Sequence, residues 1–124
     1  MTAARVVRSG DVDTIPLAGD SWSRVLIEDR TVPGTNSALG YSVFRAGSRT
    51  DDLKHETDEL AYVVSGSGSL HLEDERLAVG AGDALFIPAG AWHTVAASSA
   101  EDLAMVFSFP WPGYPRTERR PARP

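Results

Sequence analysis

Turns built from glycine and proline divide this chain into short segments, and this division limits the folds open to it. Between the turns lie runs of apolar, β-branched and aromatic residues, which are typical of β-strands. We predict strands at Trp22–Ile27, Ala38–Phe44, Leu60–Val64, Ser69–Leu72, Arg76–Val79, Ala84–Ile87, Thr94–Ala96 and Leu103–Phe109. No segment keeps a 3.6-residue apolar period, so we expect little helix. The pattern indicates an all-β sandwich or barrel.

The composition fits one domain without thiol chemistry. The chain has 124 residues and no cysteine, which excludes disulfides, thiolate catalysis and thiolate metal sites. Acidic residues outnumber basic ones by 17 to 12, and an excess of negative charge disfavours nucleic acid. No apolar run is long enough to span a bilayer. We therefore expect a cytoplasmic protein that acts on a small molecule, with neither nucleic acid nor membrane as a partner.

The last nine residues differ in composition from the rest of the chain. Residues 116–124 hold four arginines and two prolines. Chain ends of this kind are commonly solvated and disordered. We expect residues 1–115 to form a single domain and residues 116–124 to form a flexible tail.

Two histidines and one glutamate have a spacing that suits a metal site. Three residues separate His55 from Glu59, and His93 follows the turn Pro88–Gly90. Four residues of extended chain span about 13 Å, whereas donor atoms on one ion lie ~3 Å apart, so the chain must bend at Thr57-Asp58. The turn at 88–90 would bring His93 to the same point from another strand. These three residues are the candidate metal ligands and catalytic residues.

The same residues resemble a family pattern. In the pattern G-x5-H-x-H-x3-E-x6-G, His55 takes the second histidine position, Glu59 is the glutamate, and Leu53 stands where the first histidine is expected. A second pattern, G-x5-P-x-G-x2-H-x3-N, matches as far as its histidine, His93. Both patterns belong to the cupin superfamily, and residues 40–109 resemble the small single-domain cupins. The resemblance implies a double-stranded β-helix, or jelly-roll barrel, with a metal near one mouth. The triad is similar to that of hydroxypropylphosphonate epoxidase, an iron enzyme.

The choice of ligands indicates the chemistry. Imidazole and carboxylate suit iron, manganese, nickel, copper or zinc, and a facial set of two histidines and one carboxylate is the ligand set of non-haem Fe(II) oxygenases. We therefore favour one Fe(II) ion and an oxygenase. An isomerase, lyase, cyclase or dehydratase is the alternative, with a divalent ion as Lewis acid or a histidine as general base. A small-ligand-binding module without catalysis is a third hypothesis.

Further residues are candidates for the substrate pocket. They are Leu53, Thr57, Tyr62, Arg45, Trp92 and Trp111. Leu53 would form an apolar wall where a ligand is missing, Tyr62 would donate a proton or fill the core, and Arg45 could hold a carboxylate or phosphate. Trp92 would pack under its turn or line the rim. Trp111 belongs to a stiff segment, residues 110–115, that would form a lid or an arm against the partner of an expected homodimer.

Overall fold

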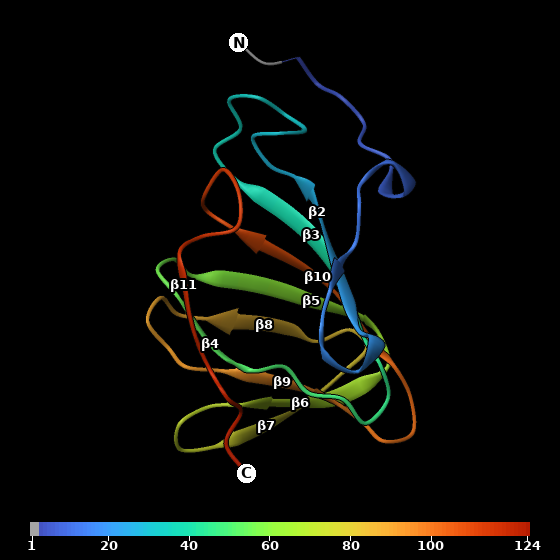
Figure 1. Ribbon diagram of the computed structural model, residues 1–124, viewed down its shortest axis with the longest axis vertical. Helices are drawn as coiled ribbons and strands as arrows, with labels where there is room; N and C mark the ends of the chain where they lie inside the picture. The colour runs from blue at the N-terminus through green and yellow to red at the C-terminus, as the bar shows by residue number, and fades with distance from the viewer. Residues whose placement is uncertain (1–2) are drawn as a thin grey trace.

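The computed structural model describes residues 3–124, which consist mainly of antiparallel strands (Figure 1). The strands are β1 (Ile15–Pro16), β2 (Trp22–Ile27), β3 (Ala38–Phe44), β4 (Asp52–His55), β5 (Glu59–Ser65), β6 (Ser67–His71), β7 (Arg76–Gly80), β8 (Ala84–Ile87), β9 (Thr94–Ala97), β10 (Leu103–Phe109) and β11 (Thr117–Arg120). Two short 3-10 turns, η1 (Ser9–Asp11) and η2 (Ala18–Asp20), are the helical elements of the described residues. The prediction of an all-β fold with little helix is confirmed.

The strands form a double-stranded β-helix. One sheet has the order β1-β2-β3-β10-β5-β8, a second has the order β7-β6-β9, and β4 pairs with β11. A bridge between Leu53 of β4 and His93 joins β4 to the residue that precedes β9. Two strands far apart in the sequence therefore meet where the candidate ligands lie.

The core lies between the sheets and follows the period-two alternation of strands. In β5, Ala61 and Val63 are buried, while Leu60 and Tyr62 are exposed. Phe109 of β10 is 1% exposed, and removing a side chain of this size from water contributes about 1.5–3 kcal/mol to stability. This core fixes the strand ends that carry the site.

Gly66, the glycine that closes the first family pattern, is required by a close contact. It links β5 to β6 with a φ of 85°, a conformation that costs little only for glycine. A Cβ atom at this position would overlap the carbonyl oxygen of Asp102. The glycine therefore allows the chain to turn between the sheets against a neighbouring loop.

The expectation of a flexible tail from residue 116 differs from the structure. Thr117–Arg120 form β11, which pairs antiparallel with β4 (Figure 1). Arg120 Nε lies 2.7 Å from Asp52 Oδ2, and Arg120 Nη2 lies 2.8 Å from Glu73 Oε1. Backbone hydrogen bonds to β4 and ion pairs hold this segment in place of apolar packing. Its sequence therefore lacks the apolar alternation by which a half-buried strand is predicted. The short, polar β4 was missed for the same reason.

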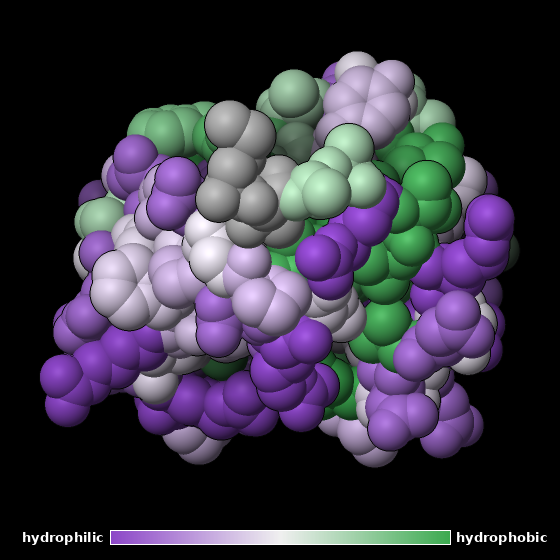
Figure 2. Space-filling view, turned by 90° about the horizontal axis from the view of Figure 1, so that it is seen from above, coloured by the Kyte–Doolittle hydropathy of each residue, from purple (hydrophilic) through white to green (hydrophobic). Residues whose placement is uncertain are grey.

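The surface carries apolar side chains among charged ones. Figure 2 shows this mixture at the end of the molecule seen from above. On the outer face of the large sheet, Leu60 and Phe86 are paired in register, and both are more than half exposed. No helix in residues 3–124 is long and apolar enough to cross a membrane.

Candidate metal centre

Three side chains from separate strand ends converge on one point. His55 ends β4, Glu59 begins β5, and His93 stands immediately before β9. The chain bends at residues 56–57, close to the place that the spacing of His55 and Glu59 requires. The bend is held by the backbone N–H of Ala89, which donates to Asp58 Oδ1 at 2.9 Å. This contact ties the loop after His55 to the turn before His93.

The donor atoms of the three residues face one another. His55 Nε2 lies 3.1 Å from Glu59 Oε1, and His93 Nε2 lies 3.5 Å from the same oxygen. One donor atom from each residue lies within 4.8 Å of the others. Both histidines are 3% exposed. A cation at this point would therefore be bound by groups that water scarcely reaches.

The other nitrogen of each imidazole is occupied by a hydrogen bond. His93 Nδ1 lies 3.0 Å from the carbonyl oxygen of Ala91, and His55 Nδ1 lies 2.7 Å from Thr117 Oγ1. A carbonyl oxygen only accepts, so His93 Nδ1 carries a proton and, when the ring is neutral, Nε2 presents a lone pair. A lone pair beside a carboxylate, backed by a hydrogen bond on the far nitrogen, is the arrangement of a metal-binding histidine. The donor set therefore fits a divalent ion.

Electrostatics keep Glu59 ionised. Burial alone would raise the pKa of Glu59, but its contacts with the His55 and His93 imidazoles together outweigh burial and hold the pKa below its ordinary value of 4.5. Burial would likewise lower the pKa of His93, but the bonds to Glu59 and to the Ala91 carbonyl raise it above 6.5. Without an ion, a proton on His93 balances the carboxylate.

These shifts predict how the stability of the metal-free protein depends on pH. The lowered pKa of Glu59 stabilises the fold above pH 4.5, and this stabilisation is lost as pH falls through the lowered pKa. The raised pKa of His93 stabilises the fold below pH 6.5, and this stabilisation is lost as pH rises through the raised pKa. The contribution of Glu59 and His93 is thus fully present between pH 4.5 and pH 6.5. Chelated protein should melt at a higher temperature at about pH 5.5 than at about pH 8.5, and Glu59→Gln should reduce that difference. An equal difference in the variant would show that other groups cause it.

A cavity of about 210 Å³ opens beside the triad. Its walls are mainly apolar and include Leu53, Val95, Met105, Phe107 and Phe109. The volume suits a molecule of one or two rings, and the apolar wall disfavours a fully hydrated ligand.

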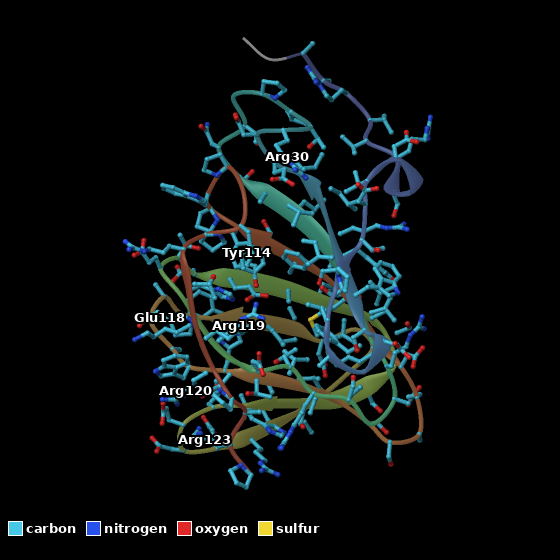
Figure 3. The ribbon with its side chains drawn as sticks, in the orientation of Figure 1. Arg30, Tyr114, Glu118, Arg119, Arg120 and Arg123 are labelled. Carbon is cyan, nitrogen blue, oxygen red and sulfur yellow. The ribbon has the colours of Figure 1, made fainter. Side chains whose placement is uncertain are left out.

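The C-terminal segment covers part of this cavity. In Figure 3, Tyr114 and Arg119 lie over the interior of the barrel, whereas Glu118 points away from it. The Tyr114 ring meets the His55 ring edge-on at 5.5 Å between centroids. Burial and the nearby Glu59 charge raise the pKa of Tyr114 above its ordinary value, so its hydroxyl keeps its proton. Arg119 is 63% exposed and lies 3.7 Å from Asp51 at the cavity mouth.

Of the residues predicted to line the substrate pocket, Leu53 lines the cavity, whereas Tyr62 and Arg45 do not. Leu53 lies in the cavity wall beside His55 and His93. Tyr62 points outward and is 52% exposed, because it falls on the face of β5 opposite to Glu59. Arg45 lies away from the cavity and pairs with Asp102 at 3.0 Å.

The remaining candidates also lie outside the cavity lining. Thr57 lies in the bend, where its hydroxyl donates to the Asp58 carbonyl. The Trp92 ring packs under the Arg120 guanidinium, 4.0 Å from ring centroid to Cζ. Trp111 is 52% exposed, and Tyr114 of the same segment takes the place over the site. Sequence reasoning placed Tyr114 in the stiff segment 110–115 that could form a lid, but it chose Trp111 as the pocket candidate. It missed Thr117 and Arg119 because their neighbours carry the composition of a disordered tail.

Comparisons with known proteins agree with this geometry. A family model described as a cupin domain matches residues 40–109. The polyketide cyclase RemF from Streptomyces resistomycificus has 25% identity and a TM-score of 0.78, over 94% of this chain and 85% of the cyclase. A mutant of Bacillus subtilis oxalate decarboxylase OxdC shares the fold, with 22% identity and a TM-score of 0.80, over 94% of this chain and 33% of the decarboxylase.

Among curated sequences, the polyketide synthase CurC from Streptomyces cyaneus is 31% identical over 85 residues, which cover 68% of this chain and 55% of CurC. The chain spans just over half the length of the curated relatives that it matches.

Proposed function

Because the chain belongs to the cupin family, we propose that it is a metal-dependent enzyme, a mononuclear non-haem Fe(II) oxygenase that acts on a small organic molecule. The observation that carries this proposal is the convergence of two imidazole nitrogens and one carboxylate oxygen within 4.8 Å. Leu53 stands at the position where the family pattern has a further histidine, so the apolar wall begins at the metal site itself. These three residues would hold a ferrous ion without surrounding it, and so would leave room for oxygen and substrate beside it.

The chain's own residues would prepare the site for this reaction. His55, Glu59 and His93 would hold the ion, and the ionised Glu59 would offset part of its charge. Leu53 and Phe109 would exclude water from one side of the ion. The protonated hydroxyl of Tyr114 would donate a hydrogen bond to an oxygen of the substrate.

The cavity lining indicates a largely apolar substrate with a polar or anionic group. The apolar walls would take the body of the molecule. The lining holds two arginines, Arg49 and Arg119, and two acids, Asp51 and Glu59; the ion would engage Glu59, which leaves an excess of positive charge for the substrate. A guanidinium pairs well with a carboxylate or phenolate. The expected homodimer stays a prediction; the paired Leu60 and Phe86 on the outer sheet face are where an apolar contact would form.

A non-redox cyclase is the second candidate, supported by the similarity to the polyketide cyclase RemF. The polyketide synthase CurC, which is also similar, points to the same class of substrate. In that case a divalent ion would act as a Lewis acid, and the same three residues would hold it.

Oxygen uptake separates the two functions. Metal-free protein is loaded with Fe(II) or Zn(II) and offered small aromatic and polyketide-like carboxylic acids that fit the cavity. The oxygenase proposal requires oxygen consumption and product with Fe(II) alone. Product that forms without oxygen, and equally well with Zn(II), would overturn it in favour of the cyclase.

A further inference from the structure

Thr117 contacts a candidate ligand from outside the part of the chain that matches the family. The matched span ends at residue 109, and Thr117 begins β11, where it is paired in register with His55. We propose that Thr117 is a positioning residue: its hydroxyl accepts the Nδ1 proton of His55 and so reserves Nε2 for the ion. This inference rests on the proposed metal site.

The direction of the hydrogen bonds follows from the partner beyond Thr117. Thr117 Oγ1 lies 2.9 Å from the carbonyl oxygen of Pro115 and donates to it, because a carbonyl oxygen has no proton to give. The single hydroxyl proton is then used, and only lone pairs of Oγ1 remain for His55 Nδ1, which lies 2.7 Å away. His55 must therefore be the donor at Nδ1. In the neutral ring, the lone pair then lies on Nε2, the nitrogen that faces Glu59.

The same tautomer arises at both histidines by different means. His93 donates from Nδ1 to a backbone carbonyl two residues earlier in its own turn. His55 ends β4, and within residues 3–124 its ring makes no hydrogen bond to its own loop. Its bond reaches 62 residues ahead to Thr117. The C-terminal strand therefore supplies the acceptor for His55 Nδ1, as the local turn supplies the acceptor for His93 Nδ1.

The position of Thr117 is itself secured by the strand on which it lies. The backbone N–H of Glu56 donates to the carbonyl of Arg116 at 3.0 Å, directly before Thr117. At the other end of β11, Arg120 pairs with Asp52, a carboxylate whose residue is 2% exposed. An unpaired buried carboxylate would be costly, so this ion pair holds the strand against β4. Thr117 and Arg119 lie on the inward face of the strand, which makes β11 a wall of the site.

Nitrogen NMR of the histidine side chains tests the proposal directly. In metal-free protein with a neutral His55 ring, wild-type His55 should carry its single ring proton on Nδ1. Thr117→Val keeps the branched shape but removes the acceptor, so the proton should move to Nε2, toward Glu59. Zinc affinity should then fall about 10–100-fold, as expected when a partner that orients a ligand is lost. Thr117→Ser keeps a hydroxyl and should restore both readouts to near wild-type values.

Thr57→Val is the matched control, because Thr57 lies in the bend beside the site and, within residues 3–124, its hydroxyl bonds only to the carbonyl of Asp58. It should leave the His55 tautomer and the zinc affinity unchanged. A wild-type spectrum with the proton on Nε2 would overturn the proposal, as would a folded Thr117→Val variant that binds zinc as tightly as wild type. If that variant fails to fold, the wild-type spectrum alone decides. Protein that binds neither Zn(II) nor Fe(II) would refute the proposed function, while the tautomer would still test this inference.

Discussion

Glu59→Ala is expected to lower zinc affinity by more than about 100-fold, a larger loss than a substitution beyond the ligands causes. The carboxylate is the one anion among the three converging side chains, and its Oε1 atom lies 3.1 Å from His55 and 3.5 Å from His93. Without it, two neutral imidazoles remain, and a cation loses both a ligand and the charge that offsets its own. Isothermal titration calorimetry with zinc measures the change.

Glu56→Ala is the control for this substitution. Glu56 lies three residues before Glu59, but its side chain is 63% exposed and pairs with Arg116 at 3.7 Å. Its loss should leave zinc affinity within about twofold, since exposed ion pairs contribute little. Equal affinities of wild type and Glu59→Ala would show that the ion does not bind at this glutamate.

Leu53→His is expected to raise zinc affinity by at least about tenfold and to reduce turnover. Leu53 lies in the cavity wall next to the triad, and its backbone exchanges hydrogen bonds with that of His93 at 2.8 and 2.9 Å. An imidazole at this position would add a fourth ligand, and zinc prefers four. The added ring would also fill a position that the proposed reaction needs open, so product formation should fall although the ion is bound more tightly.

Leu53→Met is the control that distinguishes the effect of an added imidazole ligand from the effect of any substitution in the cavity wall. Methionine keeps the volume and apolar character of leucine, and such swaps usually cost less than about 1.5 kcal/mol of stability. It should leave zinc affinity and turnover close to wild type. If Leu53→His binds zinc no more tightly than Leu53→Met, the side chain at position 53 does not point at the ion.

The sequence predicted the residues whose roles depend on local spacing. Strands that form runs of mainly apolar residues bounded by turn formers, such as Ala38–Phe44 and Leu103–Phe109, have the predicted bounds. The candidate ligands His55, Glu59 and His93 were chosen by spacing, and the structure brings all three together. A bend and a turn between strands determine this convergence, and turn-forming residues are visible in a sequence.

The features that the sequence did not predict depend on contacts between segments that are distant in the sequence. β11 is held by a backbone ladder to β4 and by Arg120, which pairs with Asp52 and Glu73. Arginine-rich composition does not distinguish a chain end held in this way from a solvated one. Thr117 and Arg119 were missed with that segment. Tyr62 was placed at the pocket by its nearness to Glu59 in sequence, whereas strand alternation turns it outward.

The measurement closest to the central claim is the metal content of the purified protein. Elemental analysis of wild type should find one transition-metal ion per chain, and iron after expression with added iron. The double variant His55→Ala, His93→Ala should hold less than about one tenth as much, because a single carboxylate does not retain such an ion. Folded wild-type protein that holds no metal, and takes up neither Fe(II) nor Zn(II) in titration, would contradict the account.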